Sequence, residues 1–204
     1  FGNLRLPTGA SPHPTGVFIH GGCWLSAFDI QHVGQTEVAI AEAGYAVWSI
    51  EYRRLGDEGG GWPSTYLDVG QGIDHLREMA EPYNLDLSRV VVAGHSAGGA
   101  LALWAAARGK VDDQSALYTP NPLPVQAVFA LAPAADLEAL EERGSCGNAV
   151  GRLMGGTPAE YPERYQAASP MQLAPISVPQ TLLIGGQDFV WAPPGRSYYH
   201  RALT

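Results

Sequence analysis

The feature that most constrains the fold is a Gly-His-Ser-Ala-Gly motif at residues 94–98, placed between a strand pattern and a helix pattern. The apolar run 89–93 directly precedes the motif and predicts a buried central strand of a parallel sheet. The Ala- and Leu-rich stretch 100–108 follows it and predicts a helix. Alone, the motif would indicate only a glycine-rich turn. In this setting it is typical of a nucleophile elbow, in which a sharp turn lifts the hydroxyl of Ser96 above the sheet edge.

The rest of the chain repeats the alternation of strand and helix patterns. Further helices are predicted at about 29–42 and 64–81, and further strands at 17–20, 45–52, 125–131 and 180–184. Strands that alternate with helices form βαβ units. The sequence therefore predicts an α/β fold, with a mostly parallel sheet and helices on both faces.

The length indicates one domain. The chain has 204 residues, of which 46% are hydrophobic, which is enough for one sizeable core. The alternation stops between residues 134 and 179, a stretch rich in glycine that also contains five prolines. This segment is either a cap or lid inserted over the carboxyl edge of the sheet or a long loop with short helices. We therefore treat residues 1–204 as one domain and residues 134–179 as its candidate cap.

Charge and cysteine content exclude several functions. Twelve basic against 20 acidic residues give a net charge of −8, which argues against partners such as nucleic acid or anionic membranes. No apolar run approaches the roughly 18 residues of a membrane span. Cys23 and Cys146 are too few for a disulfide framework or a self-contained zinc site. We expect no metal and no cofactor and a cytoplasmic location, while the oligomeric state stays open.

A second motif, His-Gly-Gly-Cys-Trp at residues 20–24, follows the strand predicted at 17–20. Acyl transfer needs two backbone N–H donors aimed at the developing oxyanion, and glycines let the backbone approach the substrate. We expect these donors to be Ala97, which follows the serine, and Gly22 or Cys23. The alternative is a plain Gly-Gly turn. The other members of the motif are expected to support the loop, His20 by hydrogen bonding and with it Gly21 and Trp24.

Asp188, just past the last predicted strand, is the candidate acid of a catalytic triad. It would orient a histidine and stabilise its imidazolium form, whereas the alternative role is that of a surface turn. Asp136 ranks below it, as an end-of-strand or helix-capping residue. His200 is the only histidine after Asp188, but residues 196–203 read as a crossover helix and not as a loop beyond a further strand. We keep His200 as a secondary candidate for the general base.

Together these motifs resemble the α/β-hydrolase superfamily, in particular its esterase, lipase and arylformamidase-like branch with an H-G-G-x-W oxyanion loop. The resemblance covers nearly the whole chain and includes residues 51–53 and 62–63. It implies an α/β-hydrolase fold and a serine hydrolase acting through an acyl-enzyme on Ser96. Compared with the family's eight-stranded sheet, most of the first strands and the last strand are lacking. We therefore expect a fragment cut at both ends, with the catalytic histidine beyond residue 204.

Three functions follow as alternatives. The first is hydrolysis of a carboxylic ester with a small or medium acyl or aryl group. The second is the same chemistry on an amide, as in arylformamidases or serine peptidases. The third is a non-catalytic protein that binds a small molecule or a partner, which the missing histidine motivates and which the two intact motifs oppose.

Overall fold

The computed structural model describes the backbone of residues 1–204 and every side chain except that of His32. A six-stranded sheet runs through it in the order β1-β3-β2-β4-β5-β6. Its first strand, β1 (Gly2–Arg5), is antiparallel to its neighbour. The others are parallel, namely β2 (His13–Ile19), β3 (Ala46–Ile50), β4 (Leu85–His95), β5 (Ala127–Leu131) and β6 (Gln180–Leu183). This confirms the predicted mostly parallel sheet.

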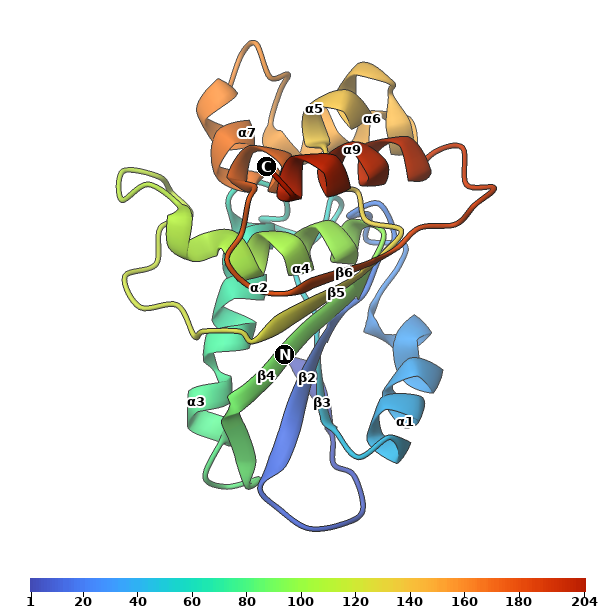
Figure 1. Ribbon diagram of the computed structural model, residues 1–204. Helices are drawn as coiled ribbons and strands as arrows, with labels where there is room; N and C mark the ends of the chain where they lie inside the picture. Colours follow the sequence, from blue (N-terminus) through green and yellow to red (C-terminus); the bar gives the residue numbers. More distant parts are fainter.

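Helices cover both faces of the sheet, as predicted (Figure 1). One face carries the 3₁₀ helix η1 (Ile30–Val33) and α1 (Gly34–Glu42), which pack against Phe18 and Val47. The opposite face carries α2 (Ser64–Asp74), α3 (Leu76–Met79), α4 (Ala97–Ala107), the 3₁₀ helix η2 (Arg108–Lys110) and α9 (Ala192–Ala202). Successive strand residues point to opposite faces, so Phe18 enters the smaller core while Val17 and Ile19 enter the larger one.

The centre of the larger core is α4, and its sequence explains why. Ten of its eleven residues are buried, because the helix lies between the sheet and the helices beyond it. A helix that is apolar on every side is stable only in such a fully packed position. The stretch 64–81, predicted as one helix, is divided at His75 into α2 and α3.

The segment 134–179 forms four short helices, which gather at one end of the molecule beyond α4 (Figure 1). They are α5 (Leu137–Glu142), α6 (Ser145–Met154), α7 (Pro162–Ala168) and α8 (Pro170–Leu173). Trp104 of α4 connects this segment to the core, since its indole N–H donates to the carbonyl oxygen of Ala167 at 3.0 Å. Across the part of the chain that the structure describes, no helix is both long and apolar enough to span a membrane.

Candidate active site

The two sequence motifs and Asp188 all follow strands that end at one edge of the sheet. Ile19 pairs with Gly94, and His95 with Leu131, at the carboxyl ends of β2, β4 and β5. Leu131 in turn pairs with Leu183 of β6. Because these strands are parallel, the chain leaves all four at the same edge, and candidate catalytic groups are expected there.

Ser96 occupies the single residue between β4 and α4, in a left-handed backbone conformation with φ 55° and ψ −118°. Its backbone N–H donates to Leu131 O at 2.8 Å, and its carbonyl oxygen accepts from Ala134 at 3.2 Å. The strand and helix meet so closely that a Cβ on Gly94 would lie 2.2 Å from the oxygen of Gly98. Only glycine fits this turn, which explains the spacing of the motif. The structure therefore places Ser96 in the strand–turn–helix geometry of a nucleophile elbow.

His20 fixes the start of the 20–24 loop from a fully buried position. Its Nδ1 donates to Gly21 O at 2.8 Å, and its Nε2 lies 3.0 Å from Glu51 Oε1. The ring stacks on Tyr52 with centroids 4.4 Å apart, and the Tyr52 hydroxyl donates to His20 O at 2.9 Å. Both ring nitrogens of His20 thus face acceptor oxygens, and the side chain joins the start of the loop to the Glu51 carboxylate.

Glu51 is the charged partner of this buried histidine. Burial of the Glu51 carboxyl opposes its ionisation and raises its pKa. Hydrogen bonds from His20 and from the N–H of Ile30, with the nearby charges of His20 and Arg54, outweigh burial, and the pKa lies below the ordinary value. Glu51 is therefore ionised at neutral pH and connects the 20–24 loop to the start of η1.

The 20–24 loop passes directly beside the elbow. A Cβ on Gly21 would lie 2.6 Å from His95 O and 3.3 Å from the Cβ of Ser96. Gly22 has a φ of 112°, and a Cβ there would collide with the Phe28 side chain at 2.3 Å. Phe28 is 45% exposed and lies against the loop, although no motif in the sequence indicated it. The backbone of Gly21 and Gly22 thus comes close to Ser96 without side chains in the way.

The backbone N–H groups expected to donate to the oxyanion lie in two different settings, a helix start and a turning loop. Ala97 is the first residue of α4, and the first N–H groups of a helix have no intrahelical acceptor. Cys23 and Trp24 have left-handed φ values of 54° and 55°, so the loop turns sharply at Cys23, one of the two candidates for the second donor. The Trp24 side chain is buried, with 1% of its surface exposed, and anchors the far end of the loop.

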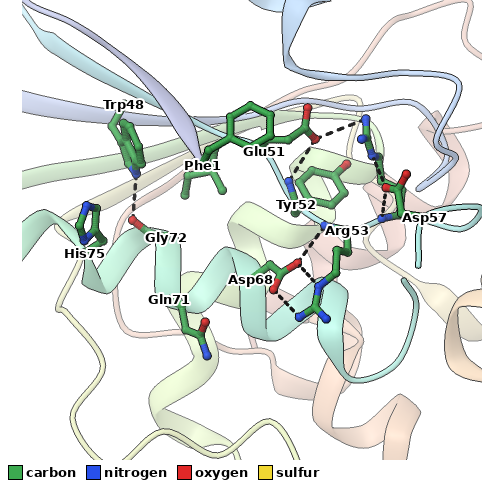
Figure 2. A pocket seen from close by; sticks show the side chains of 12 residues that line it. Phe1, Trp48, Glu51, Tyr52, Arg53, Asp57, Asp68, Gln71, Gly72 and His75 are labelled. Carbon is green, nitrogen blue, oxygen red and sulfur yellow. Dashed lines mark hydrogen bonds and ion pairs between the residues drawn. The ribbon is translucent and has the colours of Figure 1, made fainter. Parts of the chain in front are cut away.

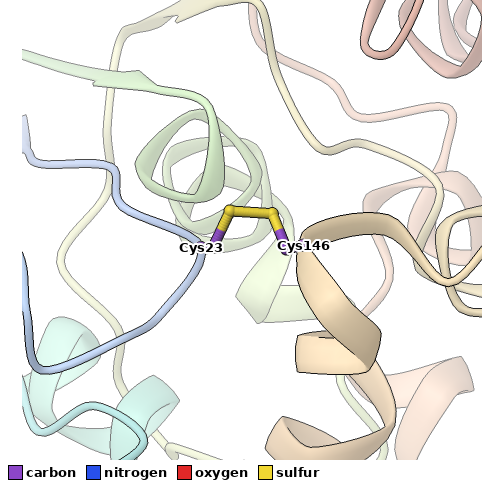
Figure 3. Close-up of a disulfide and its surroundings, with 2 residues drawn as sticks. All are labelled: Cys23 and Cys146. Carbon is purple, nitrogen blue, oxygen red and sulfur yellow. A yellow bond between two sulfur atoms is a disulfide. The ribbon is translucent and has the colours of Figure 1, made fainter.

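The two cysteines form a disulfide, which the sequence analysis did not foresee (Figure 3). Cys23 of the 20–24 loop is bonded to Cys146 of α6, and their Cα atoms are 5.8 Å apart. The two residues are 123 positions apart in the sequence, and cysteine count alone cannot show that the fold brings them together. The bridge attaches the 20–24 loop to the 134–179 segment.

Asp188 lies in the loop between β6 and α9, where its carboxylate organises the turn. Its Oδ1 accepts from the backbone N–H groups of Val190 at 3.0 Å and Trp191 at 2.9 Å. The side chain is half-buried. Only β5 separates β6 from β4, and adjacent strands are about 4.8 Å apart, so the two strands that lead to Asp188 and Ser96 lie about 10 Å from each other.

The structure does not bring His200 to this edge. His200 is exposed in the last turn of α9, and its ring packs against Tyr199 with centroids 5.5 Å apart. It lies eight residues after Ala192, at the start of the helix, which is about 12 Å at 1.5 Å per residue. Its place on a helix is as predicted. Asp136 is a helix cap, as expected, since its side chain accepts from Ala139 N at 3.1 Å in α5.

A cavity of about 670 Å³ lies elsewhere, between the loop that follows β3 and α2 (Figure 2). Arg53 spans one wall and is paired with Asp68 at 2.7 Å. On another wall, the indole N–H of Trp48 donates to Gly72 O at 2.9 Å. The arginine and carboxylate side chains that line it are paired with one another, and Ser96 is not among its lining residues. In the described part of the chain, no cluster of three or more His, Cys, Asp or Glu side chains could hold a metal ion.

Comparison with known families and proteins agrees with this geometry. The sequence matches the BD-FAE family over residues 3–198. It is 29% identical over 185 residues to esterase LipC of Mycobacterium tuberculosis, covering 89% of this chain and 45% of that protein. It is 34% identical over 100 residues to human arylacetamide deacetylase-like 4, covering 48% of this chain and 24% of that protein. The chain therefore spans less than half the length of these curated relatives.

The fold is also similar to that of solved structures. Esterase B from Lactobacillus rhamnosis, in a structure described as tributyrin phosphonate inhibited, superposes with a TM-score of 0.81 at 22% sequence identity. The match covers 98% of this chain and 65% of that one. This likeness shows the α/β-hydrolase fold.

Proposed function

The chain belongs to the BD-FAE family, and on this basis we propose that it is a serine esterase that cleaves a carboxylic ester through an acyl-enzyme on Ser96. The observation that carries the proposal is the position of Ser96. It occupies a left-handed turn between β4 and α4, and the glycine backbone of the 20–24 loop lies at its side. A candidate nucleophile and candidate backbone donors, two of the parts that acyl transfer needs besides a general base, would thus lie together at one sheet edge.

The mechanism follows from this placement. Ser96 Oγ attacks the carbonyl carbon of the ester while a general base takes its proton. The oxyanion that forms accepts hydrogen bonds from Ala97 N–H and from Gly22 or Cys23 N–H. The tetrahedral intermediate then expels the alcohol, which takes the proton held by the base. Water, deprotonated by the same base, hydrolyses the acyl-enzyme and releases the carboxylic acid, and the proton returns to Ser96. Asp188 would orient the base. We assign the role of base to none of the histidines whose side chains the structure describes.

The substrate class that suits this edge is an ester with a small or medium acyl or aryl group. Phe28 is partly exposed beside Gly22, and the backbone of Trp191 belongs to the turn that Asp188 organises. Both aromatic side chains could therefore contact an apolar group near Ser96. One relative is named an esterase and the other an arylacetamide deacetylase-like protein, so ester and amide bonds are the two chemistries to compare.

The segment 134–179 would act as a cap over this site. Its four short helices are tied to the candidate oxyanion loop by the Cys23–Cys146 bridge. A further contact joins it to the loop before α2, since Trp62 N–H donates to Leu153 O at 2.8 Å. A cap fixed at these points would form one wall of the substrate pocket.

Covalent labelling tests the nucleophile. The protein as it occurs is treated with a fluorophosphonate probe that phosphonylates activated serines, and its intact mass is measured. We expect one adduct on the wild-type protein, none on Ser96→Ala, and an unchanged adduct on Ser197→Ala, which alters an exposed serine of α9. Persistent labelling of Ser96→Ala, or no labelling of a folded wild-type protein, would refute the proposal.

A second measurement separates the ester from the amide. The rates of hydrolysis of an aryl acetate and of the N-formyl and N-acetyl amides of the matching aryl amine are compared. Esterase function predicts a higher kcat/KM on the acetate. A higher value on either amide would favour amide hydrolysis by the same serine.

A further inference from the structure

We propose that the disulfide between Cys23 and Cys146 positions the oxyanion hole, so that Cys146 is a positioning residue for ester hydrolysis and activity depends on the bridge being oxidised. The proposal rests on the function proposed above. It assigns a role to α6, which contributes no group that reacts with the substrate. Cys146 acts only through its bond to the 20–24 loop.

The first support is the place where the bridge attaches. Cys23 directly follows Gly22, and these two residues carry the candidate donors that complement Ala97. The 5.8 Å between the two Cα atoms lies within the usual range for disulfides. The bridge therefore joins the backbone of the loop at a candidate donor directly to the start of α6 (Figure 3).

The second support is the backbone conformation at both ends of the bridge. Cys23 and Trp24 have φ values of 54° and 55°, and Cys146 and Asn148 have values of 57° and 59°. Residues other than glycine rarely adopt such angles, and they keep them only where the surrounding structure holds them. The backbone at both ends of the bridge thus has a conformation that the surrounding structure must hold in place. The disulfide contributes a covalent restraint on this conformation.

The third support is that, apart from the turn that Leu25 N–H closes on Gly22 O at 2.9 Å, the other anchors of the loop lie before and after Cys23. Before it, His20 donates to Gly21 O at 2.8 Å. After it, Leu55 N–H donates to Trp24 O at 2.7 Å, and the Trp24 side chain is buried. When the bridge opens, these anchors keep the loop attached while its middle gains freedom. The expected result is poorer stabilisation of the oxyanion with little change in substrate binding.

Both sulfur-bearing residues are half-buried, so a small thiol can reach them. In the reducing reaction, the two thiols of dithiothreitol lose two electrons and two protons and form its cyclic disulfide. The Cys23–Cys146 bond takes up these electrons and protons and becomes two thiols, and glutathione disulfide reverses the change. Because structural disulfides persist in oxidising compartments, the bridge favours such a location over the cytoplasm expected from the sequence.

The test is steady-state hydrolysis of p-nitrophenyl acetate by the protein as it occurs. The proteins compared are the wild type with and without dithiothreitol, Cys23→Ser, Cys146→Ser and the double variant. We expect kcat to fall about tenfold or more, towards the roughly 100-fold lost when an oxyanion donor is removed. KM should change less than about threefold, because only transition-state binding is lost. All four treatments open the same bond, so their effects should be equal and not additive.

Control measurements separate positioning from unfolding. Ser145→Ala changes the residue beside the bridge without opening it and should keep the wild-type kcat. Dithiothreitol should leave the two cysteine variants unaffected, and circular dichroism should show that all proteins are folded. A kcat within twofold of wild type after reduction would overturn the proposal, as would a change confined to KM.

Hydrogen exchange provides a readout that does not require activity. If the wild type hydrolyses no ester, the proposed esterase function fails, but the structural claim can still be judged. Opening the bridge should accelerate amide exchange in residues 20–26 and leave α4 unchanged. Equal exchange in wild type and Cys146→Ser, or two free thiols in the oxidised protein by alkylation and mass, would overturn the positioning role.

Discussion

Gly98, in the first turn of α4, packs against the carbonyl group of Ile19 at the end of β2 so closely that a Cβ would lie 2.1 Å from its oxygen. The same Cβ would lie 2.4 Å from His20 O. Through this contact the elbow packs directly against the end of β2, the strand that leads into the 20–24 loop. The relative position of Ser96 and the candidate oxyanion donors is thus set by the close approach of two backbone segments. This approach is possible only because residue 98 is a glycine and has no side chain.

Gly98→Ala should therefore destabilise the protein. The atoms that the new methyl group meets are backbone atoms of Ile19 and His20, which can move only if the sheet or α4 shifts. Overpacking of this kind typically costs about 1–3 kcal/mol. The free energy of unfolding measured by urea denaturation should fall by about that amount.

Gly34→Ala is the matched control for this measurement. Gly34 is the first residue of α1, and a Cβ there has nothing within 4 Å. Alanine favours the helix over glycine, so the free energy of unfolding should be equal or higher by up to about 1 kcal/mol. Equal stability of the Gly98→Ala and Gly34→Ala variants would contradict the close packing of the elbow.

Gly21→Ala should impair catalysis more than stability. Its methyl group would approach His95 O at 2.6 Å and the Cβ of Ser96 at 3.3 Å, and would push the loop away from the nucleophile. We expect kcat for an aryl acetate to fall by on the order of 10- to 100-fold, because an oxyanion donor is displaced. Gly186→Ala, where a Cβ meets nothing within 4 Å, should keep the wild-type kcat. Equal kcat values for the two variants would show that the loop does not supply the donor.

Arg108 should contribute far more to stability than Arg53, although both form paired contacts with an aspartate. Arg108 is 3% exposed and binds Asp74 with two nitrogens, at 2.6 Å and 2.9 Å, and also Gly70 O. Removing one partner of a buried pair costs about 3–5 kcal/mol, whereas a surface pair contributes about 0–1 kcal/mol. The loss in Arg108→Ala should lie between these ranges, because Asp74 is 21% exposed and keeps its contacts with Arg77 and Leu123 N–H. Urea denaturation of Arg108→Ala and Arg53→Ala should show this contrast. Similar losses in both variants would contradict it.

The site could be predicted from sequence wherever its parts are adjacent in the chain. Strand, motif and helix follow one another without a gap around Ser96, so local patterns were enough to indicate the elbow. Asp136 was recognisable as a helix cap for the same reason, since it bonds to Ala139, three residues on. The 20–24 loop was found because glycines directly follow a strand.

The features that sequence reasoning missed depend on contacts between distant segments. Cys23 and Cys146 meet only because the fold brings α6 beside the 20–24 loop, and no pattern in either segment indicates the other. Phe28 lies against Gly22 because η1 and its preceding turn fold back, held by the contact between Arg54 and the Phe28 carbonyl oxygen. The break at His75 was missed because apolar residues continue at helical spacing on both sides of it.

Glu51→Gln should make the stability of the protein less dependent on pH in the acidic range. The folded state lowers the pKa of Glu51 below its ordinary value of 4.5, so ionised Glu51 stabilises the fold fully above that pH. This contribution is lost as the pH falls through the lowered pKa, where the protonated carboxyl resembles the amide of glutamine. The Tm of wild type should exceed that of Glu51→Gln by about 5 °C at pH 7, and the gap should close below pH 4.5. Glu42→Gln, on the exposed side of α1, should show no gap at either pH. A gap between wild type and Glu51→Gln that stays constant from pH 7 to pH 3 would mean that the Glu51 charge does not hold His20 and the 20–24 loop in place.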